Sequence, residues 1–220
     1  MEKVIIFGTG DISQIAYLYL LEDVRYKVVG FTVDQEYIVE NKFFDKPLVA
    51  FETIEKTYSP HEYKLFIPFG YTKVNLIRKQ KFFEAKEKGY AFITYIHPKA
   101  TIGPNTEVGE NCFIFENNNI QPYVVIEDNC MLWSGNHIGH HSIIRAHVFI
   151  ASHVVISGRC EVGEGTFIGV NATVRDHVSI GEYNVIGANA LILNNTKDNE
   201  VYMEKSTQSS RVPSNKLRGI

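Results

Sequence analysis

The length, composition and charge of the chain exclude several classes of protein. Its 220 residues, 45% of them hydrophobic, suffice for one large domain or two small ones, each with a buried core. A formal net charge of −3 at pH 7 gives no overall basic field, so we expect no nucleic-acid partner. No apolar run approaches the length that spans a membrane, and the short run before Gly8 is typical of a strand, not of a signal peptide.

Residues 1–97 are predicted to alternate between strands and helices. The apolar periodicity indicates strands over 3–7, 27–34, 64–69 and 90–96, and helices over 12–21 and 71–88, the second of which ends at Gly89. Such alternation predicts a small doubly wound parallel sheet, that is, a Rossmann-like α/β domain.

The turn that follows the first strand is rich in glycine. Gly8 and Gly10 direct backbone amides and a helix N-terminus at one point, which suits a phosphate. Asp34, at the end of the next strand, is placed to accept a hydrogen bond from a ribose or a base. Because Ser13 replaces the third glycine of the dinucleotide motif, two interpretations stay open: a nucleotide site, or a tight turn without a ligand beside a solvated Asp34.

From Ile102 onward, an aliphatic residue recurs at every sixth position. All sixteen positions hold Ile, Val or Leu: Ile102, Val108, Ile114, Ile120, Ile126, Leu132, Ile138, Ile144, Ile150, Ile156, Val162, Ile168, Val174, Ile180, Ile186 and Ile192. Three six-residue faces make one 18-residue triangular coil, so the repeat predicts a left-handed parallel β-helix with the aliphatics stacked inward. Glycine often follows the aliphatic, and we expect it to supply unusual backbone angles at the corners.

Three cysteines, Cys112, Cys130 and Cys160, form no CxxC pair and no disulfide framework, which favours a reducing cytoplasm. Each follows a repeat aliphatic by four residues, in a position that elsewhere holds mostly small or branched residues. We therefore expect buried filling residues, not nucleophiles.

Five of the eight histidines fall within 17 residues: His137, His140, His141, His147 and His153. None occupies the inward aliphatic positions, so we expect most of them at the surface of the prism or at an edge between subunits. A histidine there can act as a general base toward an amine or hydroxyl that attacks a thioester, a reaction that also needs a donor for the developing oxyanion.

Residues 18 apart lie one above the other in such a coil, separated by about 4.8 Å. Eighteen residues after His140 lies Gly158, whose unhindered backbone amide suits the oxyanion. The same step leads from His137 to Val155 and from His141 to Arg159. This geometry predicts His140 as the base.

The Gly-rich α/β domain, the linker YIHPKATIG and the uninterrupted repeat together resemble the bacterial sialic acid O-acetyltransferase and bacillosamine N-acetyltransferase family of sugar acyltransferases. The resemblance covers about residues 3–193, and GHHSIIRAHVFIASHVVISG looks like the family's catalytic segment, with His140 as the base and Gly158 as the oxyanion amide. It implies a cytoplasmic homotrimer with a nucleotide-sugar-binding domain (1–97), a β-helix acyltransferase domain (98–193) and a polar capping tail (194–220).

The resemblance further implies an acetyl-CoA-dependent N-acetyltransferase of polysaccharide biosynthesis, in which the amine of a nucleotide-linked sugar attacks the thioester directly and no metal takes part. The implied substrate-binding residues are Gly8, Gly10, Asp34, Arg78 and His137. Coenzyme A would lie between two prisms, near Gly158, Gly169 and Ala188.

Two departures from the family pattern matter. His141 replaces the acidic neighbour of the base, so either a carboxylate from elsewhere, for instance across a subunit interface, orients His140 or the base works without one. The usual Ala-Gly-Ala and Gly-x-Pro-Ala elements are also replaced, which leaves contacts to the distal end of coenzyme A open.

Three other functions stay open from the sequence. One is O-acetylation of a free or activated sugar, which would use the same base and oxyanion donor. A second is a zinc hydrolyase of the carbonic anhydrase type, since His141 and His177 lie 36 residues, or two coils, apart. The third is a trimeric scaffold without catalysis.

Overall fold

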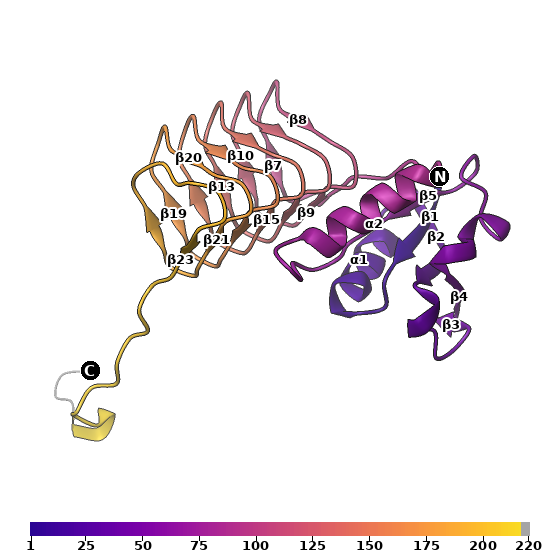
Figure 1. The fold of residues 1–220 in the computed structure, drawn as a ribbon, viewed down its shortest axis with the longest axis horizontal. Helices are drawn as coiled ribbons and strands as arrows, with labels where there is room; N and C mark the ends of the chain where they lie inside the picture. The colour runs from indigo at the N-terminus through magenta and orange to yellow at the C-terminus, as the bar shows by residue number, and fades with distance from the viewer. Residues whose placement is uncertain (217–220) are drawn as a thin grey trace.

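The computed structural model describes residues 1–216, of which the N-terminal part forms a five-stranded sheet with helices on both faces (Figure 1). The strand order is β3-β4-β2-β1-β5, and all neighbouring pairs are parallel except β3 with β4. Its elements are β1 (Glu2–Phe7), α1 (Asp11–Glu22), β2 (Tyr26–Val33), β3 (Lys42–Phe43), β4 (Lys46–Ala50), β5 (Lys64–Phe66) and α2 (Leu76–Glu87), with short 3₁₀ turns at Gln35–Tyr37 and Phe51–Lys56.

The central strand β1 is apolar on both faces because both faces are covered. Val4 and Ile6 pack in one cluster with α1, whereas Ile5 and Phe7 pack in another with α2. A parallel strand buried between two helical layers requires this near-continuous apolar sequence.

Two predicted elements of this part were wrong in their extent. Residues 90–96 do not form a strand of the sheet: Phe92 makes a single bridge to Leu65, and Tyr95–Ile96 pair with the β-helix instead. Helix α2 begins at Leu76 and not at Tyr71, because the residues from Lys73 to Asn75 have left-handed φ angles of 52°, 52° and 64°, which no α-helix accommodates.

The rest of the described chain winds into a coil of three parallel sheets, which fits the predicted left-handed β-helix (Figure 1). Each two-residue strand pairs with the strands 18 residues before and after it. One sheet holds β7 (Thr101–Ile102), β10 (Asn119–Ile120), β13 (His137–Ile138), β16 (Val155–Ile156), β19 (Thr173–Val174) and β22 (Leu191–Ile192). The next holds β8 (Glu107–Val108), β11 (Val125–Ile126), β14 (Ile143–Ile144), β17 (Glu161–Val162) and β20 (Ser179–Ile180).

The third sheet of the coil holds β6 (Tyr95–Ile96), β9 (Phe113–Ile114), β12 (Met131–Leu132), β15 (Phe149–Ile150), β18 (Phe167–Ile168), β21 (Val185–Ile186) and β23 (Val201–Tyr202). All sixteen repeat aliphatics are second residues of strands, and those from Ile114 onward form one buried core together with the three cysteines. The spacing of the repeat and the buried position of the cysteines are thus confirmed.

The outer face of the β6–β23 sheet carries the N-terminal sheet. Phe113, Met131 and Phe149 point outward from the coil and join the apolar cluster that contains Val4 and Ile6 of β1. This apolar contact fixes one face of the coil against the α/β part and leaves its other two faces uncovered within one copy of the chain.

The tail predicted over residues 194–220 first completes the coil and then leaves it. Strand β23 adds the last rung of its sheet, after which residues 203–216 are exposed and lead away from the coil, ending in a 3₁₀ turn at Ser214–Lys216 (Figure 1). The last four residues of the predicted tail lie outside the described part.

Candidate functional site

A pocket of about 670 Å³ opens at the carboxyl ends of β1 and β2. Gly8, Gly10 and Asp34, the three positions predicted for the nucleotide, all line it. Gly8 has a φ of 105°, which favours glycine, and Gly10 is the N-cap of α1 without a side-chain cap. The pocket therefore lies at an uncapped helix N-terminus at the carboxyl edge of a parallel sheet, the usual place for a phosphate.

Ser13, the residue that replaces the third glycine of the motif, has a structural role. Its hydroxyl donates a hydrogen bond of 3.1 Å to the carbonyl oxygen of Phe7, which ties the first turn of α1 to the end of β1. A Cβ atom on Gly8 would lie 2.5 Å from that hydroxyl, so Gly8 and Ser13 fit only as a pair.

Asp34 faces a lysine from α2 across the same pocket. Its Oδ1 accepts a hydrogen bond of 2.7 Å from Lys81 Nζ, which also donates to Glu84 at 2.8 Å. Burial alone would lower the pKa of Lys81, but the hydrogen bonds to Asp34 and Glu84 outweigh it and raise that pKa. The pocket wall thus presents a fixed cation beside a carboxylate, a contact that the sequence did not reveal.

Arg78, predicted as a weaker nucleotide contact, does not line this pocket. It is 1% exposed, and its guanidinium donates to the carbonyl oxygens of Phe69, His147 and Val148. Burial lowers its pKa to about 10. Arg78 therefore joins α2 to the coil, and we leave it out of the proposed nucleotide site.

His140 lies at the corner between the β7–β22 and β8–β20 sheets, directly below Gly158. A Cβ atom built on Gly158 would lie 2.8 Å from both Nε2 and Cε1 of the imidazole, so the ring is seated against the glycine backbone. The Gly158 N–H has no hydrogen-bond partner among residues 1–216. An exposed imidazole nitrogen and an unpaired amide donor therefore lie side by side, as the 18-residue coil predicts.

The other ring nitrogen of His140 is directed at its neighbour. Its Nδ1 lies 3.1 Å from Nδ1 of His141, and its backbone N–H donates to Gln121 Oε1 at 2.9 Å. The sequence identified His141 only as a missing carboxylate; the ring-to-ring contact has no signal in the repeat.

The remaining clustered histidines occupy different surroundings. His147 is buried beneath α2, His137 is half-buried on the outer side of β13, and His153 is exposed at the next corner of the coil. Within residues 1–216, no group of three or more His, Cys, Asp or Glu side chains is arranged to hold a metal ion.

Gly169 and Ala188, predicted to contact coenzyme A, meet at another edge of the prism. A Cβ atom on Gly169 would lie 2.6 Å from the backbone nitrogen of Ala188, at the corner between the β6–β23 and β7–β22 sheets. One copy of the chain therefore brings these two residues together but places Gly158 on a different edge.

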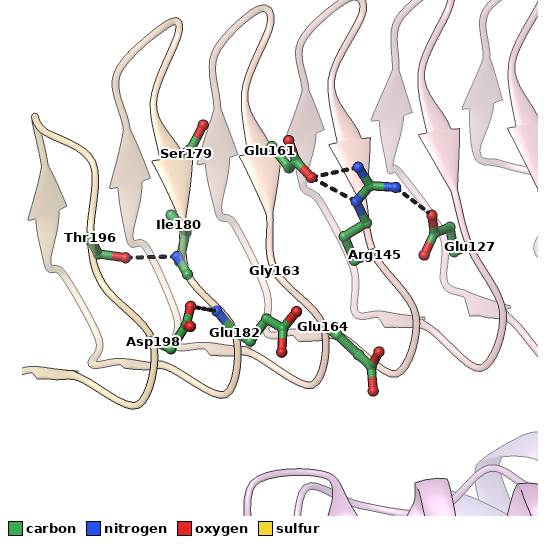
Figure 2. Close-up of a pocket in the computed structure, with 11 residues that line it drawn as sticks. Glu127, Arg145, Glu161, Gly163, Glu164, Ser179, Ile180, Glu182, Thr196 and Asp198 are labelled. Atoms are coloured by element: carbon green, nitrogen blue, oxygen red, sulfur yellow. Dashed lines mark hydrogen bonds and ion pairs between the residues drawn. The ribbon is translucent and has the colours of Figure 1, made fainter.

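A second pocket, of about 470 Å³, lies along the β8–β20 sheet and was not predicted (Figure 2). Figure 2 shows Arg145 between Glu127 and Glu161, at 2.8 Å and 2.6 Å, while Asp198 accepts a hydrogen bond of 2.8 Å from the Glu182 backbone. These partly exposed ion pairs connect successive coils and the start of the tail. They contain no nucleophile and no histidine.

Residues 92–202 match the family described as the GMPPB C-terminal domain. The chain belongs to this family. Its GMPPB C-terminal domain spans the coil from before β6 to the end of β23. No curated protein matches the chain.

Solved structures share the fold of both parts of the chain. The acetyltransferase domain of PglB from Neisseria gonorrhoeae FA1090 is 22% identical with a TM-score of 0.77, over 89% of this chain and 93% of that one. Its complex with acetyl coenzyme A is 21% identical with a TM-score of 0.79, over 91% and 95%. PerB from Caulobacter crescentus, in complex with CoA and GDP-perosamine, is 21% identical with a TM-score of 0.81, over 91% and 93%.

The resemblance to bacterial sugar acyltransferases is thereby confirmed at the level of the fold. No helix in residues 1–216 is long and apolar enough to cross a membrane.

Proposed function

We propose that the chain is an acetyl-CoA-dependent N-acetyltransferase that acts on a nucleotide-linked amino sugar. The observation that carries the proposal is the pairing of His140 with the unpaired amide of Gly158, because acyl transfer needs a base and an oxyanion donor at one place. The shared fold supports it, since the PglB domain was solved with acetyl coenzyme A and PerB with CoA and GDP-perosamine.

In the proposed reaction the sugar amine attacks the thioester carbonyl of acetyl-CoA, and Nε2 of His140 takes the proton that the nitrogen loses. The Gly158 N–H donates to the oxyanion of the tetrahedral intermediate. When the intermediate collapses, the C–S bond breaks and His140 returns its proton to the CoA thiolate. The buried cysteines take no part, because their thiols lie inside the coil.

The nucleotide would occupy the pocket of Gly8, Gly10 and Asp34, with its phosphates at the N-terminus of α1. That pocket belongs to the part that covers the β6–β23 sheet, whereas His140 lies at the corner between the other two sheets. A complete site therefore combines two copies of the chain, which favours the cytoplasmic homotrimer expected from the sequence. Coenzyme A would then run between prisms, from Gly158 of one copy to Gly169 and Ala188 of the next, with His137 near the acceptor sugar.

The proposal is tested by supplying the purified protein with acetyl-CoA and a matched set of nucleotide-linked sugars that carry either an amine or a hydroxyl at the same ring position. We expect CoA thiol release with the amino sugars and little with the hydroxyl sugars. Release with the hydroxyl sugars alone would replace N-acetylation by O-acetylation. Absence of release with every acceptor would count against transferase activity.

A further inference from the structure

The base proposed above is followed by a second imidazole where the sugar acyltransferases that the sequence resembles carry an acid. The two rings stand nearly perpendicular, at 86°, with their Nδ1 atoms 3.1 Å apart. At this distance one Nδ1–H donates to the lone pair of the other Nδ1, so the two rings share a single proton in that hydrogen bond.

His141 is held in place from below. Its ring stacks on Tyr123, the residue one coil earlier, with centroids 4.7 Å apart and planes at 22°. Its backbone has a left-handed φ of 59°, and its N–H donates to the carbonyl oxygen of Pro122 at 3.2 Å. The stacked ring and the fixed backbone aim the Nδ1 of His141 at His140.

The two nitrogens of His140 consequently have separate surroundings. Its Nε2 lies against Gly158, where the reaction is proposed to occur, and its Nδ1 lies against His141. A base at Nε2 requires a lone pair there, and a neutral imidazole has that lone pair only when the proton sits on Nδ1. The Nδ1 proton needs an acceptor, and His141 is the side chain within reach.

We propose that His141 is a positioning residue, which accepts the Nδ1 proton of His140 and so holds the base in the tautomer that leaves Nε2 free. This proposal rests on the N-acetyltransferase function proposed above. It assigns to a neutral ring of the same chain the task that a carboxylate performs in a Ser-His-Asp arrangement.

The neutral partner changes how charge is carried during the reaction. When Nε2 takes the proton from the sugar amine, the positive charge spreads over both rings through the Nδ1–Nδ1 hydrogen bond, and it disappears when Nε2 protonates the departing CoA thiolate. A second proton on the pair would break that hydrogen bond and place two cations together. Activity should therefore fall at low pH.

The charged and titratable groups that surround the pair belong to the same corner of the coil. Tyr123 lies one coil below His141 and Arg159 one coil above, and the following coil carries Asp176 and His177. Among residues 1–216, no carboxylate hydrogen-bonds to either imidazole of the pair. The orienting contact therefore depends on His141 alone in one copy of the chain.

Three variants test the role of His141 in the transfer reaction. His141→Ala should lower kcat by roughly ten- to a hundredfold, less than loss of the base itself, with little change in the KM for acetyl-CoA. His141→Asp should recover most of the rate, because aspartate accepts the same proton and tolerates a left-handed backbone. His177→Ala is the matched control, since His177 has a φ of 60° in the same corner column and makes no contact with His140.

A second readout does not depend on activity. In ¹H–¹⁵N spectra of the histidine rings of the unliganded full-length protein, His141→Ala should shift the Nδ1 resonance and the pH midpoint of His140, and His177→Ala should leave both unchanged. Unchanged His140 signals in His141→Ala, or failure of His141→Asp to recover the rate, would overturn the proposal. Coupled rings in a wild-type protein that transfers no acetyl group would instead overturn the proposed function, and with it the catalytic meaning of the pair.

Discussion

His140 gains its surroundings from the backbone conformation of the corner as well as from its own ring. Because each coil has 18 residues without exception, the residue above His140 is fixed as Gly158, and any larger residue there would clash with the imidazole. That apposition could be predicted from the sequence. The ring contact with His141 could not, because it depends on side-chain torsions and on the stack with Tyr123.

The most direct change at this scale is His140→Ala. Loss of the base should lower kcat for acetyl transfer by about 10²–10⁴-fold, while the protein keeps its fold because the side chain is exposed. Steady-state kinetics and circular dichroism measure the two effects. His153→Ala removes an exposed histidine from a different corner and should leave kcat unchanged; equal losses in both variants would contradict the assignment of the base.

The corner glycines show where local sequence reasoning reached the right residue for the wrong reason. Glycine after the aliphatic was expected to supply unusual backbone angles, but left-handed φ values fall two positions later, as at His141 and Arg159. The glycine is needed because the next coil passes close by: a Cβ on Gly139 would lie 2.4 Å from the carbonyl carbon of Ser157.

At the scale of elements, a ladder of polar side chains links the sheet domain to the coil beneath α2. Asn111 accepts a hydrogen bond from the Ile67 backbone and donates to Asn129, which in turn lies 2.8 Å from Nδ1 of His147. Nδ1 must accept from the asparagine amide, so His147 is neutral. Burial lowers its pKa to about 4, and a proton on Nδ1 would break the ladder.

This ladder predicts a pH dependence of stability. The unfolded chain binds a proton at His147 near pH 6.5 and the folded chain only near pH 4, so the free energy of unfolding should fall as pH drops through that window, by about 3 kcal/mol. His147→Asn extends the two asparagines below it, suits the left-handed φ of 64°, and removes the titration. Urea unfolding at both ends of the window should show a smaller acid loss in this variant; an equal loss would contradict the role of His147.

Elements with a strict repeat could be predicted almost to the residue, and irregular ones could not. Every strand of the coil follows from the six-residue spacing, whereas Tyr95–Ile96 left the sheet domain because pairing with β9 starts the first coil. Nothing local distinguishes these two partners. The same limit applies to Arg78, since its position on α2 gave no sign that its guanidinium would be buried against the carbonyls of the coil.

At the scale of the whole molecule, the nucleotide pocket and His140 lie on different sides of the coil, so the proposed site is shared between copies. Co-expression of two variants tests this arrangement. His140→Ala removes the base, and Gly10→Phe narrows the nucleotide pocket without a clash, since no protein atom lies within 4 Å of a Cβ there. Mixed oligomers contain sites with both functional halves, and we expect them to be more active than either variant alone. Activity no higher than the average of the two separate variants would place both halves in one copy.

The central claim is the transfer of an acetyl group to an amine. Its most direct measurement is the NMR spectrum of the product formed by the wild-type protein from [¹³C]acetyl-CoA and a nucleotide-linked amino sugar. The proposed mechanism predicts labelled acetyl on the sugar nitrogen, and almost none within the same time when His140→Ala is used. Label on a hydroxyl oxygen, or label on nitrogen at an equal rate without His140, would contradict it.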